Sequence, residues 1–176
     1  MGEHEESIVS QVLAGHPAGL NRLLMRYGHA LAEYVRAVVG DNDHIFAAVY
    51  EDVLVDVLKQ LRAISGKKSA LKRFVFESAA RTMRKRYSTL LQSGEGEKIA
   101  QPSVDEINRV EAPTEDQLKN AMKGLPAAER ELLVLRYRFG FNYGEISDII
   151  KEARVHLEDR LLAARNHFRA KLLGTI

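Results

Sequence analysis

Histidines and clustered carboxylates are the residues of this chain that could bind a metal ion or perform acid–base chemistry. The six histidines are spread along the sequence as His4, His16, His29, His44, His156 and His167. None has metal-ligand spacing to another histidine or to a carboxylate pair, so solvated or helix-capping positions explain them better. Glu51, Asp52 and Asp56 could bind a divalent cation, but an exposed acidic helix face is the simpler interpretation. We therefore expect no catalytic residue, no metal site, no cofactor and no small-molecule substrate, in a protein that is not an enzyme.

The composition indicates the compartment. The 176-residue chain has no cysteine, which excludes disulfides and thiolate zinc sites and fits a reducing compartment. The N-terminal sequence MGEHEESIVS has no basic segment followed by an apolar core, so no signal peptide is predicted. Charged residues interrupt every apolar run before it reaches membrane-spanning length. We expect a cytoplasmic protein without membrane insertion.

The charges are separated into blocks, although the net charge is only +2. Residues 41–56 hold five acids and no lysine or arginine, 67–86 hold eight bases and one acid, and 93–118 hold seven acids against two bases. A dense Lys/Arg block beside acidic blocks indicates separate surfaces, one of which attracts anions. The alternative is an ordinary solvated helix face, and bases near the C-terminal end of a helix also favour its dipole.

Apolar residues at helical spacing predict an all-α fold made of two small helical domains. In the first domain, residues 1–92, the pattern predicts helices over about 5–15, 18–40, 46–61 and 70–91. Residues 93–113 then read SGEGEKIAQPSVDEINRVEAP. This segment is acidic and interrupted by glycine and proline, which is typical of an interdomain linker. It lacks the pattern of a phosphate-binding loop and the strand that precedes one.

The second predicted domain covers residues 114–176. Two helix starts have the spacing of a capping box, Thr114 with Gln117 and Asn142 with Glu145. The last helix, from Arg154 to Leu173, is long and basic. Short helices with compact joints, followed by a longer basic helix, are typical of a helix-turn-helix that binds DNA.

Short motifs follow one another through both halves in a definite order. The C-terminal half carries Leu125-Pro126, Glu129-Arg130-Glu131, Leu135-Arg136-Tyr137, Gly140, Tyr143, Glu145-Ile146 and Ile149. The N-terminal half carries Leu13-Ala14-Gly15, the segment from Leu23 to Gly40, and Asp41. In this order the chain resembles the extracytoplasmic-function (ECF) RNA polymerase sigma factors. Its first half is similar to their region 2 and its second half to their region 4, with the linker where that family has one.

The resemblance implies a bacterial protein that binds core RNA polymerase and directs promoter-specific transcription initiation. Its partners would be core polymerase, promoter DNA and an anti-sigma factor. Polymerase binding would involve Tyr50, Glu51, Asp52, Leu54 and Val55. Region 2 would bind and melt the minus-10 element with Lys67, Lys68, Lys72, Arg73, Arg81, Arg84 and Lys85. Region 4 would read the minus-35 element with Arg154, His156, Glu158, Asp159, Arg160 and Arg165.

The chain departs from the family pattern at three places. In the polymerase-binding helix, Glu51 alone keeps its place in the acidic-glutamine run. On the basic helix, Ala80-Arg81 and Lys85 stand where the family has an Arg-Asn pair and a later Asp. Before the reading helix, the segment 151–154 replaces a glycine-containing turn, which relaxes a left-handed conformation.

The reading helix itself carries Glu158 and Asp159 where the family has a basic patch. Carboxylates can accept a hydrogen bond from cytosine, but they repel phosphate. These acids leave three interpretations open: an unusual specificity, weak upstream binding, or a repurposed domain. The alternative function is a degenerate sigma-like binding module that engages an anti-sigma factor or another regulator without initiating transcription.

Overall fold

The computed structural model describes residues 3–64, 71–88 and 113–174. Within these ranges the chain forms eight α-helices and no β-strand, which confirms the all-α prediction. None of the helices described is long and apolar enough to cross a membrane.

Four α-helices form the N-terminal unit. They are α1 (Glu3–Leu13), α2 (Pro17–Val39), α3 (Asp43–Gln60) and α4 (Leu71–Arg86), with the 3-10 helix η1 (Leu61–Ile64) after α3. Proline suits the first turn of α2, where no backbone donor is needed, and Gly40 ends this helix with a positive φ of 78°. The Asn42 side chain then accepts a hydrogen bond from the Ile45 amide at 3.1 Å and starts α3.

Four further α-helices form the C-terminal unit. They are α7 (Glu115–Lys123), α8 (Ala127–Leu133), α9 (Tyr143–Ile150) and α10 (Arg154–Leu173), with the π-helical turn η2 (Val134–Arg138) after α8. Both predicted capping boxes are confirmed, at Thr114 and at Asn142. The sequence predicts one helix between Pro126 and Gly140. The structure has α8 in the first part of this range and the wider π-helical turn η2 in the second, which ends at Arg138.

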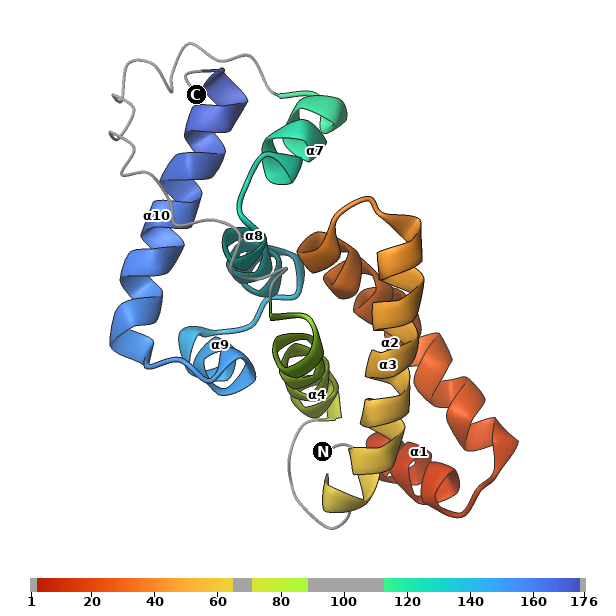
Figure 1. The fold of residues 1–176 in the computed structure, drawn as a ribbon. Coiled ribbons are helices and arrows are strands. Elements are labelled where there is room, and N and C mark those ends of the chain that lie inside the picture. The colour runs from red at the N-terminus through yellow and green to blue at the C-terminus, as the bar shows by residue number, and fades with distance from the viewer. Residues whose placement is uncertain (1–2, 65–70, 89–112, 175–176) are drawn as a thin grey trace.

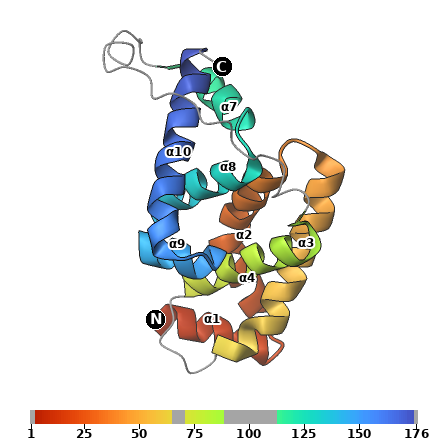
Figure 2. The ribbon, with the colours of Figure 1, turned by 60° about the vertical axis from the view of Figure 1, so that its left-hand side comes forward.

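The two units pack against each other through α4. This helix lies beside α9 and below α8, with α2 and α3 on its other side (Figures 1 and 2). Phe76 of α4 is fully buried, and its ring centroid lies 5.3 Å from that of Tyr34 on α2. From the C-terminal unit, the ring centroids of Phe139 and Phe141 lie 4.7 and 5.2 Å from that of Phe76. The aromatic cluster joins both halves into one apolar core.

The domain boundaries at 92 and 114 remain a prediction. Of the predicted linker, only Pro113 belongs to the described residues. The fold nevertheless positions the candidate sites, because α4 carries the basic block and α10 carries the expected reading helix.

Candidate nucleic-acid interfaces

The first turn of α4 brings its basic residues against the C-terminal unit. Lys72 donates a hydrogen bond from Nζ to the Phe139 carbonyl oxygen at 2.6 Å, and it lies 4.6 Å from the ring centroid of Phe141. Its neighbour Arg73 pairs with Asp148 of α9, with 3.2 Å between Nη1 and Oδ2. Both cations predicted to bind phosphate therefore already have oxygen partners within the chain.

Farther along α4, Arg84 reaches a buried carboxylate. Its Nη2 lies 2.7 Å from Oε2 of Glu131, whose side chain is only 4% exposed. The other Glu131 oxygen accepts a short hydrogen bond from the hydroxyl of Tyr34. Burial, followed by the nearby Glu131 charge, raises the pKa of Tyr34 well above its usual value, so the hydroxyl keeps its proton and remains a donor.

The remaining cations of the basic block are less involved with the C-terminal unit. Arg81 is exposed and donates to Ser78 Oγ at 3.3 Å, and Lys85 is exposed. Arg86 pairs with Asp52 and lies 3.6 Å from Asp56.

Lys67 and Lys68 lie outside the described residues, so their predicted role is not tested.

The N-terminal half of α10 is exposed, but its arginines are paired. Arg154 lies 3.6 Å from Glu158 one helical turn later, and Arg160 pairs with Glu152 in the preceding turn. His156 and Asp159 are also exposed. Arg165 is half-buried and lies on a different part of the helix, beside an apolar groove. Five of the six residues predicted for minus-35 binding are thus exposed in the first two turns of α10, and the sixth, Arg165, lies farther along the helix.

The turn before α10 forms without glycine. Lys151 ends α9 in the left-handed conformation, with φ 58° and ψ 43°, which costs a side-chain-bearing residue more than glycine. The Lys151 amide donates to the Ser147 carbonyl, and its Nζ pairs with Glu77 of α4. The lysine therefore links the strained turn to α4, a function that a glycine could not perform.

The exposed face of α10 also carries apolar side chains, which the sequence analysis did not include among the residues of the minus-35 surface. Val155 is 70% exposed and Leu162 is 47% exposed. Together with Glu158 and Asp159 they follow the i, i+3, i+4, i+7 spacing of one helix face. The signal is present in the sequence, but the buried stripe on the opposite face dominates the pattern.

The predicted polymerase-binding residues lie on α3 and only partly face solvent. Tyr50 donates its hydroxyl to the Gly28 carbonyl at 3.1 Å, and Leu54 lines a small apolar cavity beside α2. Asp52 accepts a hydrogen bond from Tyr87 at 2.7 Å, which, with Arg86, lowers the pKa of the Asp52 carboxyl. Glu51 and Val55 are exposed, so these two are the residues of this set that a partner reaches first.

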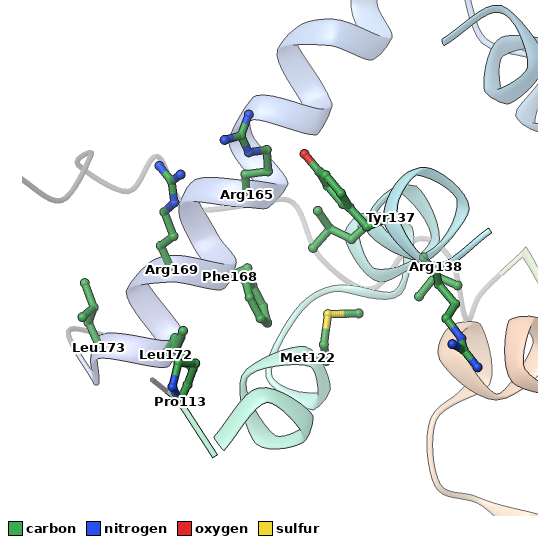
Figure 3. A pocket seen from close by; sticks show the side chains of 11 residues that line it. Pro113, Met122, Tyr137, Arg138, Arg165, Phe168, Arg169, Leu172 and Leu173 are labelled. Atoms are coloured by element: carbon green, nitrogen blue, oxygen red, sulfur yellow. The ribbon is translucent and has the colours of Figure 1, made fainter. Parts of the chain in front are cut away.

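An apolar groove runs between α7, the α8–η2 segment and the C-terminal half of α10. In Figure 3, Phe168 points towards Met122 across the groove, while the Tyr137 hydroxyl points towards Arg165. Arg138 points away, towards α2 (Figure 3), where it pairs with Glu33 at 2.7 Å. The groove has a volume of about 620 Å³ and is lined by Pro113, Met122, Leu133, Val134, Tyr137, Arg138, Arg165, Phe168, Arg169, Leu172 and Leu173.

The motif Glu129-Arg130-Glu131 has structural roles that its sequence did not reveal. Glu129 contacts the buried His167 ring at 2.7 Å. Arg130 donates to the carbonyl oxygens of Ala37 and Val38 at 2.6 and 3.2 Å, which satisfies the free end of α2. Glu131 binds Tyr34 and Arg84. The partners of all three residues are distant in sequence, so spacing alone could not identify them.

Comparison with known proteins supports the fold. No protein-family model matches the chain, and no curated protein matches it in sequence. Among solved structures, that of CnrH in complex with the cytosolic domain of CnrY is similar, with a TM-score of 0.63 and 20% sequence identity. The match covers 97% of this chain and 98% of the CnrH chain. CnrH is an ECF sigma factor, so the described part of this chain has a fold like that of an ECF sigma factor.

Proposed function

We propose that this chain is an ECF-type sigma factor, which binds core RNA polymerase and directs promoter-specific transcription initiation. The observation that carries the proposal is the likeness of fold to CnrH over almost the entire length of both chains. The basic residues of α4 and the helix-turn-helix arrangement of α9 and α10 agree with it. In this role the chain acts in the cytoplasm as a binding protein and not as an enzyme.

Each unit has a separate task in this proposal. The exposed edge of α3, with Glu51 and Val55, contacts core polymerase. The cations of α4 bind the phosphates of the minus-10 element while its bases are held out of the stack. The exposed face of α10 enters the major groove at the minus-35 element, where residues near the N-terminus of a reading helix contact base edges.

An anti-sigma factor is the proposed regulatory partner. The structure that resembles this chain contains CnrH with the cytosolic domain of CnrY, an anti-sigma factor. The groove between α7 and α10 is largely apolar and has Arg165 and Arg169 in its lining. An amphipathic helix with acidic residues beside its apolar face would complement this groove.

Transcription with purified components tests the proposal. Core polymerase with this protein should start at specific promoters, and core polymerase alone should not. The variant Glu51→Lys should reduce this activity because it reverses a charge on the proposed polymerase contact. If the protein neither binds core polymerase nor supports initiation at specific promoters, the proposal is wrong.

A sigma-like binding module that no longer initiates transcription is the second candidate. The pairing of Arg154 with Glu158 and of Arg160 with Glu152 favours it, because paired arginines have less charge available for phosphate. This module would bind an anti-sigma factor or another regulator but not core polymerase. A pull-down with core polymerase separates the two candidates.

A further inference from the structure

A straight ridge of side chains runs along the exposed half of α10. At 3.6 residues per turn, positions 155, 159 and 162 lie within about 60° of one another around the helix. They lie opposite the buried stripe that contains Leu157 and Leu161, which are 1% and 2% exposed. Val155, Asp159 and Leu162 are all exposed. This ridge is therefore the part of α10 that projects farthest from the core.

The ridge offers a hydrogen-bond acceptor between two apolar side chains, and it offers no donor. Val155 is 70% exposed and Leu162 is 47% exposed, and neither side chain contains a polar atom. Asp159 makes no hydrogen bond or ion pair with any residue in the described part of the chain. Because an ionised carboxylate only accepts hydrogen bonds, Asp159 is an acceptor that still lacks a partner within these residues.

Arginines lie on both flanks of the ridge. Arg154 lies on one side and pairs with Glu158, whereas Arg160 lies on the other side and pairs with Glu152. Ion pairs between solvent-accessible side chains are weak, so phosphate oxygens can replace these carboxylates as partners of the arginines. A major groove has base edges along its floor and phosphates along both walls. The ridge and its flanks therefore match a major groove in the order of their chemistry.

The four bases differ in what they offer to such a ridge. Guanine presents two acceptors in the major groove, and adenine presents an acceptor beside its donor. Either purine would therefore place an acceptor near the carboxylate. Cytosine presents its N4 amino group as a donor, and thymine presents a methyl group beside its O4 acceptor. A carboxylate between apolar side chains thus favours cytosine at its own position and thymine on either side.

The length of the ridge sets the length of the tract that it can contact. From Val155 to Leu162 the helix rises about 10 Å, at roughly 1.5 Å per residue. Successive bases of one strand lie about 3.4 Å apart along a duplex. The ridge therefore spans about three base steps, which corresponds to a tract of about four bases.

We propose that this ridge gives the chain a preference for about four consecutive pyrimidines on one strand of duplex DNA. The Asp159 carboxylate accepts a hydrogen bond from the N4 amino group of a cytosine near the centre of the tract. Val155 and Leu162 contact the methyl groups of thymines on either side of it. The preference rests on the proposed entry of α10 into the major groove, whereas the composition of the ridge rests on the structure alone.

Selection from a library of DNA duplexes tests the preference. The duplexes are randomised over a stretch twice as long as the tract, and the full chain is used at low salt, where phosphate contacts are strongest. The selected sequences should share a pyrimidine tract with a central cytosine. Replacing a contacted thymine by uracil, which removes only the methyl group, should then lower the affinity about fourfold.

Substitutions in the ridge separate the acceptor from the apolar contacts. Asparagine pairs with N6 and N7 of adenine, so Asp159→Asn should lose its preference for cytosine, on the order of tenfold, and should select adenine instead. Val155→Ala combined with Leu162→Ala should remove most of the difference between the thymine and uracil duplexes. Asp116→Asn and Leu118→Ala, at exposed positions of α7, are the matched controls and should select as the unchanged protein does.

The inference is overturned if the ridge variants select the same sequences as the α7 controls, a result that would leave the ridge as a contact for another protein. It is also overturned if the unchanged chain selects no sequence or a tract rich in guanine. Defined start sites with core polymerase, but no pyrimidine preference, would reject the inference and keep the proposed sigma activity. A preference that depends on Asp159, without specific initiation, would keep the inference and reject that activity.

Discussion

The basic face of α4 and the exposed half of α10 are both candidate DNA-binding surfaces, but their cations find acidic or carbonyl partners in different ways. On α4, the cations Lys72, Arg73 and Arg84 pair with oxygen atoms of the C-terminal unit, which are distant in sequence. On α10, Arg154 and Arg160 remain exposed but pair with acids close in sequence. The pairs on α4 therefore depend on how the two units pack, whereas those on α10 depend only on its local sequence.

The difference shows that the number of bases in a segment does not measure its free positive charge. Residues 67–86 hold eight bases, yet the partners of several of them come from distant helices. At the start of α10 the partners of Arg154 and Arg160 are local, so the charge of that segment can be predicted from the sequence.

The largest effect is expected from removing the α4 cations. Replacing Lys72, Arg73, Arg81 and Arg84 together with alanine should abolish open-complex formation, because melted strands need their phosphates neutralised. Permanganate footprinting of a promoter would measure this. Replacing four exposed bases elsewhere, Arg22, Lys59, Lys119 and Lys123, provides the control and should leave melting in place. Unchanged melting in the α4 variant would contradict the assignment.

A second effect concerns the buried carboxylate that joins the units. Glu131→Ala should lower the free energy of unfolding by about 2–3 kcal/mol, because it leaves Arg84 and the Tyr34 hydroxyl without their shared partner. Urea denaturation would measure the loss. Tyr34→Phe, which removes only the hydroxyl, should cost about 1 kcal/mol. Equal stability of Glu131→Ala and the unchanged protein would show that the buried contact is absent in solution.

A charge reversal on α10 sharpens the comparison from the other side. Glu158→Lys should strengthen binding to upstream duplex DNA on the order of tenfold at low salt, because it releases Arg154 and adds a second cation. A salt titration of the affinity would measure it, with Asp116→Lys as the control for net charge. Equal or weaker binding would indicate that Glu158 accepts a hydrogen bond from a base.

The smallest effect is expected at Glu33, which pairs with Arg138 across the two units. The hydrogen bond from Arg138 holds the pKa of this carboxyl below its ordinary value. Its stabilisation is therefore fully present above the ordinary pKa and is lost as the pH falls through the lowered value. Glu33→Gln should cost about 0.5 kcal/mol at neutral pH, and this cost should shrink as the pH falls and the carboxyl takes up its proton. Thermal unfolding over a series of pH values measures the change, and a pH-independent difference would exclude the ion pair as its cause.

The local structure was largely accessible from the sequence. The capping boxes at Thr114 and Asn142 were predicted because they depend on residues three positions apart. The helical periodicity identified the apolar faces for the same reason, since each face is fixed by neighbours one turn away.

The packing of the two halves against each other could not be predicted from the sequence. The partners of Lys72, Arg84 and Glu131 are between 47 and 97 positions away in the chain, and no spacing rule links them. The π-helical turn at the end of α8 also escaped prediction, because the apolar pattern does not distinguish it from a regular helix. It brings Phe139 and Phe141 to Phe76 and so helps to close the two units together.

The central proposal is that this chain is a sigma factor that directs core polymerase to specific promoters. The most direct measurement compares transcription of promoter-containing DNA by core polymerase with and without the protein. We predict transcripts with defined start sites only when the protein is present. Start sites that are the same with and without the protein would contradict the proposal.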